Sequence, residues 1–167
     1  MINPKGEYRP SIHRFSLGDA EVTTIQDGAH LREPINPPFS LEKSKADIKK
    51  IADMNNLPSS GFENSYTPTV IQISKQTVLF DTGFGEMGRN NHAGNLRRRL
   101  GQAGYAPEDI DVVAFTHCHP DHIAGIMEAG ALAYPNARYV IGRREYDAWK
   151  DGSEIPPQRV QNREMFL

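Results

Sequence analysis

The chain contains 167 residues, of which 38% are hydrophobic and 24% are charged. That length and composition can bury one hydrophobic core, so we expect a single globular domain over residues 1–167. The formal net charge of −2 gives no electrostatic reason to expect nucleic acid as a partner. The apolar runs fall far short of the roughly 20 residues that span a bilayer, so we expect no membrane association.

Two features of the sequence bear on the cellular compartment. The first residues, from Met1 onward, are charged and contain a proline, and they show no apolar signal sequence. The single cysteine, Cys118, cannot form a disulfide within the chain, which fits a reducing compartment. We therefore expect a cytoplasmic protein.

The first third of the chain is predicted to form a hairpin, a loop and a helix. Residues 12–17 and 21–26 read as strands on either side of a glycine turn, which indicates a β-hairpin. Residues 28–40 contain three prolines and are predicted to form an extended loop that covers a site or, more simply, the surface. Residues 41–54 have helix-forming composition, with Ser40 as the expected N-cap and the lysines facing solvent.

The rest of the chain alternates strands and helices. After a polar loop at 55–65, the apolar patterns predict strands at 70–73, 78–80, 112–116 and 138–141, and helices at 95–103 and 143–150. This alternation is typical of an α/β layered fold. The strand at 112–116 leads directly into His117, so the most distinctive motif of the sequence lies at a strand's carboxyl end.

That motif is the hexapeptide His117-Cys118-His119-Pro120-Asp121-His122. In an extended chain His117 and His119 point to the same side and can share one metal ion. Pro120 changes the chain direction, so Asp121 and His122 can present a carboxylate and an imidazole to a second ion. The alternative reading is an accidental surface cluster, which fits poorly with three histidines at a strand end.

The donor types of the motif narrow its chemistry. Nitrogen and oxygen donors without thiolate suit zinc, manganese, iron or cobalt, and zinc is the commonest metal in hydrolytic sites that retain an open position. Cys118 points away from the histidines, so we interpret it as a packing residue and not as a nucleophile. The sequence therefore predicts a hydrolytic metal site on this loop.

The motif His117-x-His119-x-Asp121-His122, preceded by Val78-Leu79-Phe80-Asp81-Thr82-Gly83, resembles the metallo-β-lactamase superfamily. The segments at 103–111, 134–137 and 145–149 resemble the branch that contains methyl parathion hydrolase-like and lactonase-like enzymes. The resemblance covers residues 64–149. It implies an α/β fold that forms the N-terminal half of an αββα metallo-β-lactamase-type sandwich.

The resemblance also assigns roles to residues. It implies two divalent metal ions, with zinc expected, one bound by His117 and His119 and the other by Asp121 and His122. Asp121 is in addition the residue for which we predict a catalytic role. Asp81 is expected to lie beside the site and to orient a ligand histidine, although a turn residue at a strand end would look the same in the sequence.

The implied function is metal-dependent hydrolysis, in which a metal-activated hydroxide attacks an ester, lactone or phosphotriester-like small molecule. No histidine follows His122, although the family pattern contains further ligands after this motif. The alternative function is therefore a truncated, non-catalytic metal-binding or interaction module. We expect an incomplete domain, and with it an exposed apolar face that promotes self-association.

Other polar and aromatic residues are expected to lie outside the site. His92 is interpreted as a solvated loop residue, and the run Arg97–Arg99 as a solvated helix face. Trp149 and the tyrosines at 134, 139 and 146 are interpreted as packing aromatics.

Overall fold

The computed structural model describes residues 10–33, 42–152, 155, 160, 162 and 163. The chain divides into two compact units, which are described separately. The main unit comprises Met1–Gly28 and Tyr66–Leu167, and the small unit comprises Ala29–Ser65. The expectation of one domain over residues 1–167 stays a prediction.

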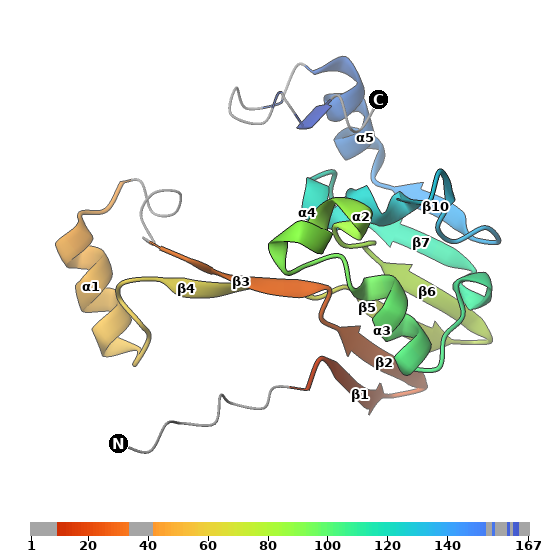
Figure 1. The fold of residues 1–167 in the computed structure, drawn as a ribbon, viewed down its shortest axis with the longest axis horizontal. Helices are drawn as coiled ribbons and strands as arrows, with labels where there is room; N and C mark the ends of the chain where they lie inside the picture. The colour runs from red at the N-terminus through yellow and green to blue at the C-terminus, as the bar shows by residue number, and fades with distance from the viewer. Residues whose placement is uncertain (1–9, 34–41, 153–154, 156–159, 161, 164–167) are drawn as a thin grey trace. The chain divides into compact units, whose positions relative to one another are not determined.

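A six-stranded mixed sheet forms the centre of the main unit (Figure 1). Its strands, in spatial order, are β1 (Ile12–Leu17), β2 (Ala20–Ile25), β5 (Thr69–Ile73), β6 (Gln76–Phe80), β7 (Val112–Phe115) and β10 (Arg138–Ile141). The pairs from β1 to β6 are antiparallel, whereas β6, β7 and β10 run parallel. The predicted hairpin and all four later strands are confirmed to within a few residues at their ends.

Short helices and turns connect these strands. They are α2 (Gly85–Gly88), η1 (Arg89–Asn91), α3 (Leu96–Gln102), η2 (Pro107–Asp109), α4 (Pro120–Ile123), η3 (Ala124–Ile126) and α5 (Arg143–Asp151), with a small β8 (Met127–Glu128) and β9 (Ala131–Leu132) pair. The two longer helices, α3 and α5, confirm the sequence prediction. No helix in the described part of the chain is long and apolar enough to cross a membrane.

The hydrophobic core lies between one face of the sheet and α3. Ile25, Val70 and Leu79 from the sheet pack with Leu96 and Leu100 of α3, and none of these five side chains is more than 2% exposed. The inward spacing of the two leucines explains why this segment forms an amphipathic helix.

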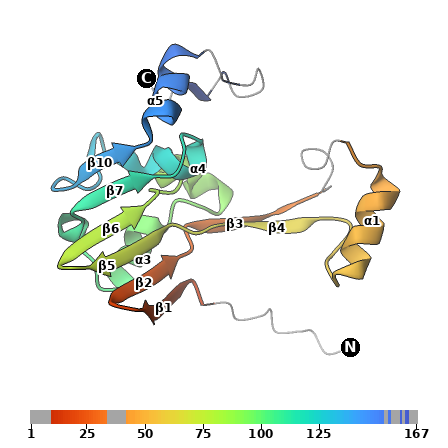
Figure 2. The ribbon, with the colours of Figure 1, turned by 180° about the vertical axis from the view of Figure 1, so that it is seen from behind.

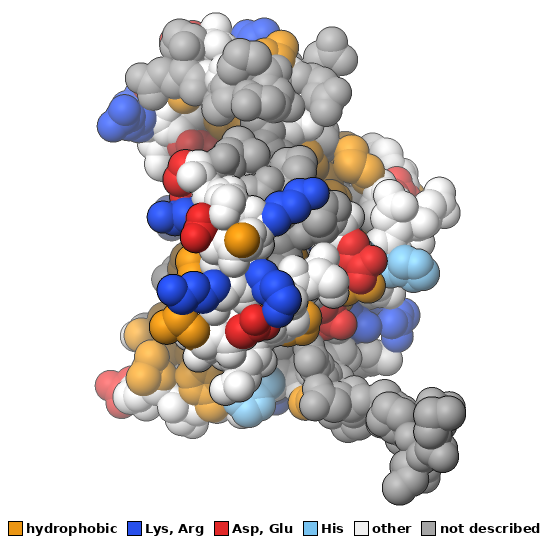
Figure 3. All heavy atoms as spheres, turned by 90° about the vertical axis from the view of Figure 1, so that its left-hand side faces the viewer, with side chains coloured by type: hydrophobic (Ala, Val, Ile, Leu, Met, Phe, Trp, Pro, Cys, Tyr) orange, Lys and Arg blue, Asp and Glu red, His pale blue; other side chains and the backbone are white. Residues whose placement is uncertain are grey.

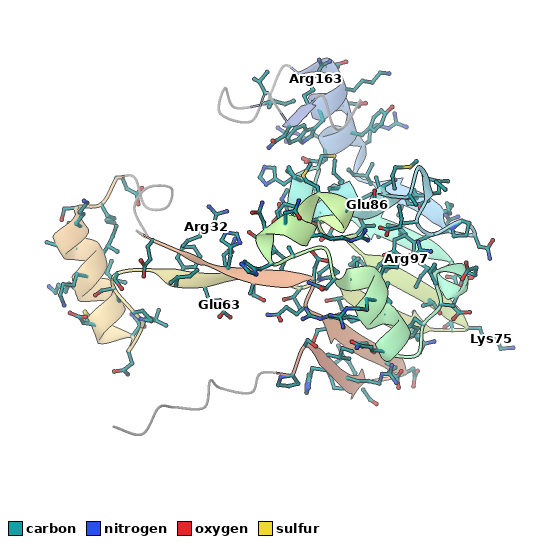
Figure 4. The ribbon with its side chains drawn as sticks, in the orientation of Figure 1. Arg32, Glu63, Lys75, Glu86, Arg97 and Arg163 are labelled. Carbon is teal, nitrogen blue, oxygen red and sulfur yellow. The ribbon has the colours of Figure 1, made fainter. Side chains whose placement is uncertain are left out.

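The arginines of α3 depart in part from the predicted solvated face. Arg98 is exposed, but Arg97, labelled in Figure 4, donates from Nη1 to the carbonyl of Ala133 at 2.9 Å. Arg99 donates to the carbonyl of Gln26, and burial lowers the pKa of its guanidinium. Two of the three side chains therefore join α3 to neighbouring segments instead of only meeting water.

The second face of the sheet is apolar as well. Directly paired residues point to the same side of a sheet, and the pairing aligns one row across five strands: Phe15, Val22, Ile71, Val78 and Val112. Seen from behind, in Figure 2, no described helix of the main unit covers the strands. On this face Phe15 is 41% and Ile73 is 43% exposed.

The small unit contains helix α1 (Lys45–Met54) and most of the two-stranded sheet of β3 (Gly28–Arg32) and β4 (Phe62–Tyr66). The first residue of β3 and the last of β4 belong to the main unit. The predicted helix at 41–54 begins four residues too early, because Ser44 is the N-cap and forms a capping box with Asp47. The expected cap Ser40 lies outside the described residues.

The predictions of loops at residues 28–40 and 55–65 are partly wrong. Residues 28–32 and 62–66 form strands β3 and β4 instead of loops. Within the described residues these two strands form a two-stranded sheet of their own. Their sequences carry no long run of alternating apolar residues that would reveal them. Residues 34–41 of the proline-rich segment lie outside the described residues.

Candidate metal centre

The histidine motif occupies the connection between β7 and α4. Strand β7 ends at Phe115, and α4 begins at Pro120, which stands at the first turn where its missing N–H costs no helical hydrogen bond. His119 is the N-cap, with φ −73° and ψ 153°, and its carbonyl accepts from the amide of His122 at 2.9 Å. The predicted change of direction at Pro120 therefore brings His122 back toward the two preceding histidines.

The imidazole of His117 lies against those of both other histidines of the motif. The ring centroids of His117 and His119 are 4.4 Å apart, and those of His117 and His122 are 3.8 Å apart. All three side chains, and that of Asp121, are half-buried. The structure thus brings together the four residues that the sequence singled out as metal ligands.

Asp81 lies directly beside this cluster. It follows β6 with a φ of 63°, a left-handed conformation that aspartate tolerates better than most residues. Its Oδ1 accepts from the amide of Thr116 at 2.8 Å, and its Oδ2 accepts from Nδ1 of His122 at 2.8 Å. This geometry is the one expected of a carboxylate that orients a ligand histidine; its role in metal binding stays a prediction.

The second nitrogen of the His122 ring faces another carboxylate. Nε2 of His122 and Oδ2 of Asp121 are 3.2 Å apart. Burial alone would lower the pKa of His122, but hydrogen bonds to Asp121 and Asp81 outweigh it and raise that pKa to about 9. For Asp121, the hydrogen bond and charge of His122 outweigh burial and lower the pKa. In the metal-free protein, His122 is therefore a cation held between two carboxylates.

Burial and the charge of His122 act together on His117 and lower the pKa of its ring. Its Nδ1 lies 3.0 Å from the hydroxyl of Thr116, a residue that also contacts both oxygens of Asp81. The pKa values of these two histidines in contact are therefore shifted in opposite directions, that of His122 upward and that of His117 downward.

Backbone contacts fix the glycine-rich loop after β6 against α4. The amide and hydroxyl of Thr82 both donate to the carbonyl of His122, at 2.7 and 2.9 Å, and the amide of Gly125 donates to the carbonyl of Gly83 at 3.0 Å. A Cβ at Gly125 would lie 2.1 Å from the carbonyl oxygen of Thr82, so only glycine allows this approach. These contacts set the distance between Asp81 and His122.

Cys118 does not take part in the polar cluster. It is 1% exposed and packs with Ile123 and Trp149. Burial, with a smaller contribution from the charge of Glu145, raises the pKa of the Cys118 thiol to about 12. The interpretation of Cys118 as a packing residue is confirmed.

Two residues of the site environment escaped the sequence analysis. Thr116 bridges Asp81 and the histidines, and its only local signal is a hydroxyl residue immediately before His117. Asp27 is fully buried, and its carboxylate accepts from the amides of Phe84, Gly94 and Leu96. These amides belong to distant segments, so nothing near Asp27 in the sequence indicates the role.

The residues present fit a divalent metal in donor type, since three imidazoles and a carboxylate are gathered on one loop without thiolate. Within the described ranges, however, no group of three or more His, Cys, Asp or Glu side chains converges in a metal-binding arrangement. The contact between Asp121 and His122 joins two of the expected ligands to each other. The cluster therefore contains the donor atoms of a metal site, but the described residues do not surround a common point at which an ion would bind.

The chain belongs to the metallo-beta-lactamase superfamily, because the model of that family matches residues 63–163, well over half of the chain. A search of curated protein sequences gave no match. The sequence-based assignment to this superfamily is therefore confirmed.

Solved structures give the same fold. AidC, a dizinc quorum-quenching lactonase in complex with a product, superimposes with a TM-score of 0.78 at 26% identity, over 90% of this chain and 54% of that one. The hydrolase AbOPH of the beta lactamase superfamily gives 0.78 at 24% identity, over 93% and 53%. A probable metal-dependent hydrolase from Staphylococcus aureus gives 0.65 at 22% identity, over 82% and 52%.

The chain thus spans about half the length of the solved structures that it matches. The predicted fold class, an α/β fold that corresponds to half of a metallo-β-lactamase structure, is confirmed.

Proposed function

We propose that this chain provides part of a metal-dependent hydrolase site, centred on His117, His119, Asp121 and His122. The observation that carries the proposal is the contact cluster of three imidazoles at the carboxyl end of β7, with Asp81 hydrogen-bonded to one of them. Membership of the metallo-beta-lactamase superfamily supports it.

In this proposal His117 and His119 hold one divalent cation, and Asp121 and His122 hold a second, with zinc as the expected metal. The dizinc description of AidC supports two zinc ions. Bound cations would supply a hydroxide nucleophile and polarise the oxygen of the substrate. The chain's own residues position these ligands, since Asp81 and Thr116 hold the His122 ring. The catalytic role proposed for Asp121 is to place a negative charge next to the His122 ring.

The proposed substrate is a small molecule with an ester, lactone or phosphotriester-like group. The likeness to AidC, described as a lactonase, favours a lactone. Nucleic acid is not favoured, since the net charge is −2 and Lys and Arg side chains lie among Asp and Glu side chains on the face drawn in Figure 3. We also propose a cytoplasmic location, because the single cysteine cannot form a disulfide within the chain, which fits a reducing compartment.

A second candidate function is a non-catalytic metal-binding or interaction module. Two observations favour it: the expected ligands do not converge within the described residues, and the chain covers 54% of AidC. Activity separates the two functions, because a module would hold metal without hydrolysing any substrate.

The first experiment is elemental analysis of purified residues 1–167, compared with a His117→Ala, His119→Ala double variant. We expect zinc or another transition metal in the unchanged chain and its loss in the double variant. Lys75→Ala, a change at the exposed β5–β6 turn (labelled in Figure 4), is the matched control and should keep the metal. Absence of metal from the unchanged chain, even after reconstitution with zinc, contradicts the proposed site.

Hydrolysis assays on the metal-loaded chain then test the activity. Lactones, carboxylic esters and phosphotriesters are compared at fixed metal concentration. Turnover that disappears in the double variant supports a hydrolase, whereas bound metal without turnover supports the non-catalytic module.

A further inference from the structure

One carboxylate oxygen of helix α5 accepts two hydrogen bonds beside the histidine loop. Oε1 of Glu145 accepts a hydrogen bond from the backbone amide of Cys118 at 2.8 Å and another from Nε1 of Trp149 at 2.8 Å. Cys118 stands between His117 and His119, so the carboxylate holds the central peptide of the predicted ligand pair. No other side chain that the structure describes bonds to this amide.

Glu145 and Trp149 lie on the same face of α5. Glu145 and Trp149 are four residues apart, which places their side chains one above the other. Trp149 is 5% exposed, and its ring meets that of His119 edge to face, with centroids 6.0 Å apart and an angle of 84° between the planes. The carboxylate thus fixes the loop backbone and also the indole that packs on the second histidine.

The carboxyl end of α5 has a hydrogen-bond donor outside the helix. Nε of Arg163, labelled in Figure 4, donates to the carbonyl of Trp149 at 2.9 Å. Glycine at 152 closes the helix with a φ of 76°. Besides this hydrogen bond, α5 packs on the histidine loop through Trp149, which lies against Cys118 and Ile123.

The geometry points to Glu145 as a positioning residue, which, together with Trp149, holds His117 and His119 in the orientation needed to bind one metal ion. This inference rests on the proposed metal site. A carboxylate in this place is well suited because one anionic oxygen can accept from two N–H groups at once, and such bonds are stronger than those between neutral groups. The peptide plane at Cys118 in turn limits the directions in which both flanking imidazoles can point.

The test compares Glu145→Ala, Glu145→Gln and, as a matched control on the same helix, the exposed Asp147→Ala. Circular dichroism first establishes that each variant is folded. Cobalt is then titrated into each protein, and its affinity and visible absorption spectrum are recorded, because the spectrum reports ligand geometry directly.

We expect Glu145→Ala to weaken cobalt binding about 10- to 100-fold and to change the absorption spectrum, as removal of an orienting group does in other metal sites. Glu145→Gln should recover most of the affinity, since its amide oxygen can accept both hydrogen bonds. Asp147→Ala should behave as the unchanged chain. Wild-type affinity and spectrum in Glu145→Ala would overturn the inference.

A second measurement separates this inference from the proposed function. In the metal-free protein, hydrogen exchange of the Cys118 amide and the ring resonances of His117 and His119 are followed by NMR. Glu145→Ala should accelerate exchange and shift both rings, while Asp147→Ala changes neither. If the unchanged chain binds no cobalt, the proposed metal site fails, but shifted rings still uphold the positioning role; unshifted rings reject it.

Discussion

At His122 two carboxylates contact the two nitrogens of one imidazole ring. Asp81 accepts from Nδ1 at 2.8 Å, and Asp121 lies 3.2 Å from Nε2. The pKa of His122, raised to about 9, means that the metal-free ring carries a proton on each nitrogen at neutral pH. A metal can bind this ring only after one proton has left, so protons and metal compete here.

Removal of Asp81 should weaken metal binding without removing a ligand. We predict that Asp81→Ala lowers the affinity for added zinc or cobalt about 10- to 100-fold, because the His122 ring loses the acceptor that fixes its orientation. Isothermal titration at constant pH measures the change. Asp19→Ala, at the exposed turn between β1 and β2, is the control; equal affinities for the Asp81 variant and the unchanged chain would contradict the assignment.

The thiol of Cys118 should resist alkylation in the folded chain. Its pKa is raised to about 12, so at pH 9 the folded thiol stays protonated, whereas an unfolded cysteine with a pKa near 8.5 is largely thiolate. We predict that iodoacetamide labels the native protein far more slowly than the urea-unfolded protein at this pH. Mass spectrometry over time gives both rates, and similar rates would show that Cys118 is accessible and ionised in the fold.

At the scale of elements, one buried carboxylate joins three segments of the main unit. Asp27 lies two residues after the end of β2, and its carboxylate oxygens accept from the amides of Phe84 in the loop after β6 and of Gly94 and Leu96 at the start of α3. A Cβ at Gly83 would lie 2.5 Å from Cγ of Asp27, so this loop passes directly over the carboxylate. The support of the Asp81 loop therefore includes a carboxylate that lies two strands away, at the same end of the sheet.

We predict that Asp27→Ala destabilises the main unit by about 3 kcal/mol, because three buried amides lose their acceptor. Urea unfolding followed by circular dichroism measures the difference in the free energy of unfolding. Asp27→Asn should cost less, since one amide oxygen can still accept. Asp19→Ala should leave the midpoint unchanged, and a similarly small effect of Asp27→Ala would show that these hydrogen bonds are easily replaced by water.

At the scale of the whole molecule, the sheet of the main unit has two apolar faces and one layer of described helix. One face packs on α3, whereas the other carries the row from Phe15 to Val112. Val22 and Val112 of this row are buried, whereas Phe15 and, on the same face, Ile73 are exposed. Exposed apolar side chains on one face can mark a place where protein packs on protein. The structures matched by this chain contain nearly as much chain again.

We predict that the purified chain self-associates through this face. Sedimentation velocity should show oligomers whose fraction increases with concentration. Phe15→Lys combined with Ile73→Lys should shift the protein toward monomer, because both side chains lie exposed on the apolar face and charges there resist burial. Met54→Lys, at an exposed position of α1, is the matched control. A monomer at all concentrations in the unchanged chain would contradict the prediction.

The sequence by itself determined the features that depend on neighbouring residues. The spacing of Leu96 and Leu100 predicted α3, and the dense apolar residues at 70–73 and 78–80 predicted β5 and β6. Pro120 predicted the turn that gathers the three histidines of the motif. Each of these signals lies within one turn of helix or one strand. The assignment to the metallo-β-lactamase superfamily also rested on local motifs, namely the histidine motif and the segment at 78–83.

Only the tertiary structure decided which distant groups meet those motifs. Asp27 and Leu96 are 69 residues apart, Asp81 and His122 are 41 apart, and Cys118 and Glu145 are 27 apart. Hydrogen bonds over such separations depend on strand order and helix placement, which no local pattern encodes. The sequence therefore determined the donors of the proposed metal site, and the packing of β6, β7 and α5 determined how they are held.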